Sequence, residues 1–162
     1  MRIVLTITLL IFFLLTVVFS ATVETLTLEE VRSQYLDYVN DYRKKRGLNE
    51  LEQRFSYIAQ SHASDQAAKD HYNAHRGFNE RADQIMALLK EESTAEKTYF
   101  GFLSVAENCC YFPICPDPAK QAFQQFISSP SHRRNLLKRF QYTAIGIDQG
   151  ESGCFYFCQL FF

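Results

Sequence analysis

The sequence lacks several features that would each point to a class of protein. Its 162 residues carry 17 basic and 18 acidic side chains, a net charge of −1. It therefore has no basic surplus of the kind that nucleic-acid-binding proteins use, and we expect no nucleic-acid partner. It contains no tryptophan, six glycines and four prolines, with neither a Pro- or Gly-rich linker nor an internal repeat. A chain of this length without linkers favours one domain, because domains run to about 100–200 residues.

Three signatures of catalytic or metal sites are also missing. No Cys-x-x-Cys pair occurs, which argues against a thiolate metal cluster. His71 and His75 have the i, i+4 spacing that can bind a metal on a helix, but no glutamate follows His71 as in zinc proteases. No Gly-x-Ser-x-Gly motif occurs either. Ser131 adjoins His132, and adjacent residues seldom place a nucleophile in line with its base, so serine hydrolysis is disfavoured.

The one long apolar run stands at the N-terminus. Arg2 precedes an uncharged stretch over residues 3–19, and Val18 and Ser20 fit the small-residue rule for cleavage. This pattern predicts a secretory signal peptide over residues 1–20 and a single mature domain over residues 21–162. An uncleaved membrane anchor is the alternative, but the run is slightly shorter than the roughly 20 residues of a spanning helix. We therefore expect a secreted protein with no stable membrane span after cleavage.

The mature chain contains an odd number of cysteines. The five are Cys109, Cys110, Cys115, Cys154 and Cys158. A secreted location favours disulfide bonds, and the odd count leaves at least one thiol free or in an intermolecular bridge. If Cys154 and Cys158 share a strand they lie about 13 Å apart, beyond the roughly 7 Å limit for a disulfide. Each must then pair with one of the three earlier cysteines or stay free.

Local patterns predict helices and strands along the mature chain. Thr27 and Glu30 form a capping box before a helix that closes at the basic run 43–46 and Gly47, and we interpret that run as a solvated helix end. Further helices are predicted for residues 50–70, for 79–89 and after Asp117-Pro118, with a charged loop over 90–97. Strands are predicted for 102–109, 142–148 and 154–161, the last two as a hairpin. This order predicts an antiparallel sheet with helices on its faces.

The aromatic content and one buried histidine each allow two interpretations. Fifteen phenylalanines and nine tyrosines indicate a Phe-rich core. The alternative is an exposed aromatic groove that binds lipid, with Phe155, Phe157, Phe161 and Phe162 as candidates. His62 lies on the apolar stripe of the second helix, and we predict a hydrogen-bonded core histidine rather than a metal ligand.

Three segments could together form a polar site. His132 follows the helix-stopping Ser129-Pro130, where the interrupted backbone lets a side chain point into a cleft. Ala106-Glu107-Asn108 and the stretch from His75 to Arg81 could join it. Two imidazoles and two carboxylates in one cleft would suit a metal site or acid/base chemistry.

These segments, taken with others in the same order, resemble the CAP superfamily of cysteine-rich secretory, antigen 5 and pathogenesis-related 1 proteins, also called SCP-domain proteins. The resembling motifs are Asn40-Asp41-Tyr42-Arg43-x3-Gly47-Leu48, Ala59-x3-Ala63, His75-x4-Glu80-Arg81, Ala106-Glu107-Asn108, Ser129-Pro130-Ser131-His132-Arg133-x-Asn135-Leu136-Leu137, Ile145-Gly146-Ile147 and Gln159-Leu160-Phe161. The resemblance implies an α+β fold, a three-layer α-β-α sandwich with a central, mainly antiparallel sheet.

The resemblance also implies a cleft tetrad of His75, Glu80, Glu107 and His132. Its two histidines would bind Zn²⁺ or another divalent cation, with the carboxylates orienting the imidazoles. A hydrogen-bonded network without metal is the other interpretation. The implied function is non-catalytic capture of a sterol, a fatty acid or an extracellular protein, and the alternative is a metal-assisted hydrolase with Glu80 or Glu107 as base. The chain stops after the last predicted strand, so we expect no cysteine-rich C-terminal domain and no ion-channel activity.

Overall fold

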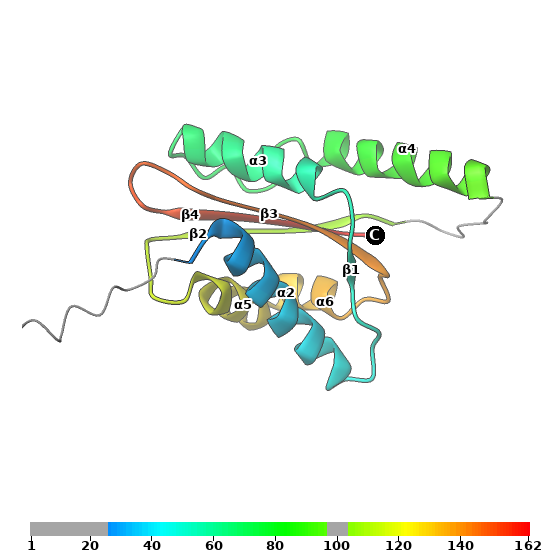
Figure 1. The fold of residues 1–162 in the computed structure, drawn as a ribbon, viewed down its shortest axis with the longest axis horizontal. Helices are drawn as coiled ribbons and strands as arrows, with labels where there is room; N and C mark the ends of the chain where they lie inside the picture. The colour runs from blue at the N-terminus through cyan, green and yellow to red at the C-terminus, as the bar shows by residue number, and fades with distance from the viewer. Residues whose placement is uncertain (1–25, 97–103) are drawn as a thin grey trace, which may run out of the picture.

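A four-stranded sheet lies between two layers of helices. The computed structural model describes residues 26–96 and 104–162, so the predicted signal peptide and the start of the predicted strand at residue 102 lie outside the described residues. Helices α3 and α4 cover one face of the sheet, and α2, α5 and α6 cover the other (Figure 1). This arrangement confirms the predicted three-layer α-β-α sandwich.

The sheet is mainly antiparallel, as predicted. The helices are α2 (Leu28–Lys44), α3 (Ser56–Ala68), α4 (Phe78–Glu96), α5 (Pro118–Ser128) and α6 (Pro130–Leu136), and the strands are β1 (Glu52–Gln53), β2 (Ala106–Phe112), β3 (Tyr142–Gln149) and β4 (Phe155–Phe161). The strand order is β1-β3-β4-β2. Strand β4 pairs antiparallel with both β2 and β3, whereas β1 pairs parallel with β3. Strand β2 is therefore an edge strand of this sheet.

Helices with a strong local signal form as predicted. The Thr27 side chain accepts from the Glu30 backbone N–H while the Glu30 carboxylate accepts from the Thr27 N–H, which completes the capping box. Asp117 caps α5 through the Lys120 N–H, with Pro118 at the first helical position. Such caps satisfy backbone donors that a helix start leaves unpaired, so they fix where each helix begins.

The helix predicted from residue 50 starts six residues later, and a short strand takes its place. The Glu52 N–H donates to the Gln141 carbonyl and the Arg54 N–H to the Thr143 carbonyl. Phe55 then adopts the left-handed conformation (φ 54°) that turns the chain into α3. Hydrogen bonds to a distant strand therefore override the helical spacing of the apolar side chains in this segment.

Helix α4 and strand β2 also differ from their predicted bounds. A charged loop was predicted over residues 90–97. This prediction is wrong for residues 90–96, because α4 continues to Glu96. Arg54 helps to fix this part of α4, because its guanidinium donates to both carboxylate oxygens of Glu92 at 2.8 Å. Strand β2 extends beyond residue 109 to Phe112, since it pairs residue by residue with β4 up to Phe155.

The terminal phenylalanines belong to the core. Phe155, Phe157, Phe161 and Phe162 are 7%, 1%, 0% and 6% exposed. The first three pack in the core beneath α2 and α5, and Phe162 packs in the core beneath α3 and α4. The predicted Phe-rich core is therefore confirmed, and the alternative interpretation of these four residues as an exposed lipid groove is wrong.

The basic run at the end of α2 is only partly solvated. Lys44, Lys45 and Arg46 are exposed, but Arg43 is 1% exposed. Its guanidinium donates to the backbone carbonyls of Asn49, Leu136, Lys138 and Phe140. Arg43 therefore ties the end of α2 to the segment between α6 and β3, and the interpretation of this residue as a solvated cation is wrong.

Candidate metal centre

The candidate site lies at the outer edge of the sheet, beside β2. His75 comes from the turn between α3 and α4, and His132 comes from α6 in the opposite helical layer. Their ring centroids are 6.4 Å apart. Both residues also contact β2, His75 through the Glu107 side chain and His132 through the Asn108 side chain. The fold thus brings two imidazoles from opposite layers together around an edge strand.

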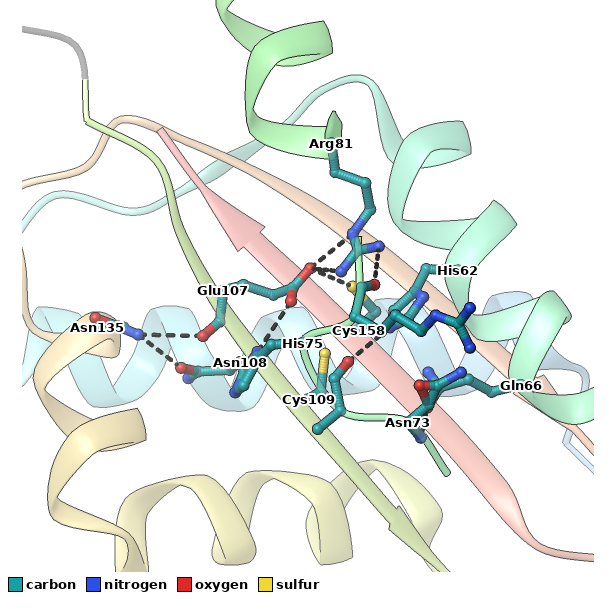
Figure 2. Close-up of polar contacts among 12 residues, drawn as sticks. His62, Gln66, Asn73, His75, Arg81, Glu107, Asn108, Cys109, Asn135 and Cys158 are labelled. Atoms are coloured by element: carbon teal, nitrogen blue, oxygen red, sulfur yellow. Dashed lines mark hydrogen bonds and ion pairs between the residues drawn. The ribbon is translucent and has the colours of Figure 1, made fainter. Parts of the chain in front are cut away.

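Glu107 is the buried anchor of this site, and Figure 2 shows its side chain pointing towards Arg81. One carboxylate oxygen lies 2.9 Å from His75 Nδ1. The other accepts from Arg81 Nε at 2.8 Å and lies 2.6 Å from Arg81 Nη2. Burial alone would raise the pKa of Glu107, but the His75 hydrogen bond and the Arg81 charge outweigh it and lower that pKa. Glu107 is therefore an ionised carboxylate inside the protein.

The ionised carboxylate fixes the orientation of His75. A carboxylate only accepts hydrogen bonds, so His75 Nδ1 must carry the proton that it shares with Glu107. In the neutral form of His75 the lone pair is then on the opposite ring nitrogen, Nε2. The His75 side chain is half exposed, so this nitrogen is accessible from solvent. Carboxylate–histidine pairs of this kind orient imidazole ligands in metal sites.

His132 is positioned by backbone and ring contacts. Pro130 starts α6 directly after α5, and the His132 ring packs edge-on against Phe126 with centroids 5.2 Å apart. Its backbone carbonyl accepts from Asn108 Nδ2, and Asn135 donates to the Asn108 side chain. Burial, and then the neighbouring His75, lower the pKa of His132. A neutral imidazole, the form that binds metals, is therefore favoured.

The fourth predicted residue, Glu80, lies elsewhere. It is exposed and lines a groove of about 510 Å³ between α3 and α4, together with His62. Within residues 26–96 and 104–162, no hydrogen bond or ion pair joins Glu80 to the other three tetrad residues. Arg81, the next residue along, occupies the place beside Glu107. Sequence reasoning assigned no role to Arg81, although it stands in the same motif, and a role for Glu80 stays a prediction.

The remaining histidines do not form a second site in the described residues. His62 is 8% exposed, and its Nε2 donates to the Ala74 carbonyl at 2.7 Å, which confirms the core-histidine interpretation. His71 lies in the irregular segment after α3, and His75 lies in a turn. The i, i+4 spacing of His71 and His75 therefore does not place the two residues on one helix.

Replacing His62 should change how stability depends on pH. Burial lowers the pKa of His62 below its ordinary value of 6.5. Below about pH 6.5 the unfolded chain therefore binds this proton more readily than the folded protein, so stability is full above that pH and falls as the pH drops. We expect His62→Gln, whose amide can still donate to Ala74, to flatten the fall between pH 7 and pH 5 in denaturant titrations. The control is His71→Gln, and a control slope as flat as that of His62→Gln would contradict the assignment.

A thiol lies close to the same carboxylate. His75, Glu107 and Cys109 each offer one ligand atom within 4.8 Å of the others. The Cys158 contact lowers the pKa of the Cys109 thiol, but burial and the Glu107 charge outweigh it, and that pKa is raised. Cys109 is only 1% exposed, and both Glu107 oxygens already have partners. The two imidazoles therefore remain the better donor set.

Comparison with known proteins identifies the family. The profile of the cysteine-rich secretory protein family, CAP, matches residues 36–161. This chain therefore belongs to the CAP family, and the resemblance noted in its motifs is confirmed. No curated protein sequence matches the chain.

Solved structures from three bacteria share the fold. An outer surface protein of Borrelia burgdorferi superposes with a TM-score of 0.62 and 16% identity, over 84% of this chain and 94% of that one. An extracellular SCP-domain protein of Bacillus anthracis superposes with a TM-score of 0.54 and 22% identity, over 85% of this chain and 44% of that one. A cysteine-rich secretory protein of Staphylococcus aureus superposes with a TM-score of 0.50 and 17% identity, over 83% of this chain and 40% of that one. The chain thus spans less than half of the last two proteins, and these identities support the fold alone.

Proposed function

We propose that this chain is a secreted CAP-domain binding protein that holds a divalent cation, Zn²⁺ first, between His75 and His132. The observation that carries the proposal is the buried Arg81–Glu107–His75 chain of contacts, which orients one imidazole beside the other. A hydrogen-bonded network without metal is the alternative, and zinc titration distinguishes the two.

The donor set fits zinc. Neutral imidazole nitrogen is a preferred zinc ligand, and the lowered pKa of His132 favours its neutral form. Two protein ligands leave coordination positions open. A bound zinc ion would offer those positions to water or to an oxygen or nitrogen donor of a partner. In this proposal Arg81 and Glu107 bind no metal themselves and act by holding His75.

Binding is a better-supported role than hydrolysis. A general base needs a free lone pair directed at the proton that it removes. Glu107 is buried, and its oxygens are held by His75 and Arg81, while Glu80 is exposed and lines the groove between α3 and α4. Neither carboxylate is therefore placed as a base beside the two imidazoles.

The cation site supports a polar partner more than an apolar ligand. The four phenylalanines that would have formed a lipid groove lie in the core, so capture of a sterol or fatty acid has no residues assigned to it. We propose instead that the partner is an extracellular protein that supplies an oxygen or nitrogen donor.

An extracellular location is also part of the proposal. It rests on the predicted signal peptide and on the description of similar proteins as outer surface, extracellular or secretory. In the part of the chain that the structure describes, no helix combines the length and apolar character needed to cross a membrane.

Zinc titration by calorimetry tests the proposal. We expect the wild-type protein to bind one zinc ion per chain with micromolar or tighter affinity, because two oriented imidazoles and solvent complete the coordination. The His75→Ala/His132→Ala double variant should lose this binding. The matched control is His71→Ala, which removes an exposed histidine outside the site and should bind as wild type does.

A second variant tests the role of the buried carboxylate. Glu107→Gln keeps the size of the side chain but removes its charge, and we expect about 10–100-fold weaker zinc binding, as is typical when the partner of a histidine ligand is altered. Far-ultraviolet circular dichroism checks that each variant is folded. A folded wild-type protein that binds no zinc, or a double variant that binds as tightly, would contradict the proposal. Hydrolytic activity lost in His132→Ala would favour the enzyme alternative.

A further inference from the structure

We propose that Cys109 and Cys158 form a disulfide bond that joins β2 to β4 beneath Glu107, and that Cys110 stays a free thiol. This inference does not depend on metal binding. All five cysteines lie in the described part of the chain as thiols. The pairing follows from the strand register and from the face of the sheet that each side chain occupies.

The register places the two cysteines directly opposite each other. Cys109 and Cys158 are paired residues of the antiparallel β2–β4 ladder. Opposed residues in such a ladder have α-carbons roughly 4.5–5.5 Å apart, and disulfides span about 4.4–6.8 Å between α-carbons. The two thiols are close enough for each to shift the pKa of the other. Bond formation therefore needs only a small adjustment of the two side chains.

The alternation of the strand excludes the neighbouring cysteine from this pair. Successive side chains of a strand point to opposite faces of the sheet. Cys109 and Cys158 belong to the core beneath α3 and α4, whereas Cys110 belongs to the core on the other face. Across the ladder Cys110 meets Phe157. Cys110 is therefore a buried core thiol without a sulfur opposite it.

The chemistry is an exchange with a small-molecule disulfide. Each thiol loses its proton and the two sulfur atoms become bonded to each other, so the pair gives up two protons and two electrons. The exchanging disulfide is reduced to two thiols and takes both. Because Cys109 and Cys158 are 1% and 0% exposed, we expect the bond to form during folding and then to resist reductants until the protein unfolds.

The disulfide bond would stabilise the strand that carries Glu107 of the candidate site. Cys158 Sγ lies 3.5 Å from a Glu107 oxygen (Figure 2), and Glu107 stands on β2, which among the described strands pairs only with β4. Linking these strands holds the carboxylate in place while leaving its His75 and Arg81 contacts intact. The proposal thus assigns a structural crosslink to the strand that carries the anchor of the site.

Peptide mapping under non-reducing conditions tests the pairing. The full chain is produced through an oxidising secretory compartment, alkylated in denaturant without reductant, and cleaved with chymotrypsin. Cleavage after Tyr111 separates Cys109 from Cys115, and cleavage after Phe157 separates Cys154 from Cys158. The variant Cys110→Ala removes the ambiguity between adjacent cysteines. We expect one linked peptide pair containing Cys109 and Cys158, lighter than the two reduced peptides by two hydrogens.

Two further measurements make the result decisive. Cys158→Ser should abolish the linked peptide and leave Cys109 open to alkylation in denaturant, and Cys110→Ala should keep the link. Reductant should lower the thermal midpoint of wild type when it is added in denaturant before refolding, and should leave Cys109→Ser/Cys158→Ser unchanged. Three results would overturn the proposal. They are alkylation of both Cys109 and Cys158 in the secreted protein, a link from either of them to another cysteine, and a metal adduct on their two thiols in native mass spectrometry.

Discussion

Gly146→Ala is expected to destabilise the protein by at least about 3 kcal/mol, which is near the upper end for overpacking. Gly146 lies in β3, at the point where α3 crosses the sheet. A β-carbon added here would lie well inside contact distance of the Ala59 carbonyl group and the Gln60 nitrogen. These are backbone atoms of α3, so no side-chain rotation relieves the clash, and the helix itself must move away from the sheet.

A second glycine gives the matched control. Gly47 follows α2 with φ +70° and has open space around the added β-carbon, so Gly47→Ala should cost only about 1–2 kcal/mol for the left-handed backbone. The chain has no tryptophan, and guanidinium unfolding is therefore followed by circular dichroism. Equal costs at the two positions would contradict the close packing of α3 on β3.

Arg43→Met is expected to cost about 3–5 kcal/mol, as for removal of one partner from a buried charged contact. Its guanidinium donates to four backbone carbonyls between α2 and β3. Methionine fills much of the volume but donates no hydrogen bond, so these buried acceptors lose their partner. Arg43→Lys should recover only part of the loss, because an ammonium cannot match the planar fork of donors.

The same change at Arg46, in the turn after α2, provides the comparison. Arg46 is exposed, bonds to the Tyr42 carbonyl and lies over the Tyr42 ring at 3.5 Å. Exposed contacts of this kind contribute about 0.5–1 kcal/mol, so Arg46→Met should shift the unfolding free energy by no more than that. If Arg43→Met proved as mild as Arg46→Met in the same titration, the buried role of Arg43 would be wrong.

Elements with their own local signal were predictable from the sequence. The capping box at Thr27 and the Asp117-Pro118 start fixed two helices, because the groups that satisfy each helix start stand within three residues of it. Strand β1 could not be predicted in this way. Its two residues pair with β3, about ninety positions later in the chain, and no local pattern carries that contact.

The residues of the candidate site also differ in how well the sequence predicted them. The motifs of the family pointed to His75, Glu107 and His132, and the structure brings these three together. Arg81 and Arg43 were missed because their roles depend on distant partners, a carboxylate on the edge strand for Arg81 and the carbonyls after α6 for Arg43. Glu80 matches the same family motif, but in the described residues it lines the groove between α3 and α4 and has no hydrogen bond or ion pair with the other three residues. A motif therefore predicts which residues belong to a site, but it does not predict which residues they contact.

X-ray absorption spectroscopy of the zinc-loaded protein tests the central claim most directly, because it reports which atoms surround the metal. If His75 and His132 hold the ion, the spectrum will show imidazole nitrogen and solvent oxygen at about 2.0–2.1 Å and no sulfur shell at about 2.3 Å. The imidazole signal should disappear in His75→Ala/His132→Ala. A sulfur shell would place the ion on the thiols beneath Glu107, and would contradict both the imidazole site and the proposed disulfide.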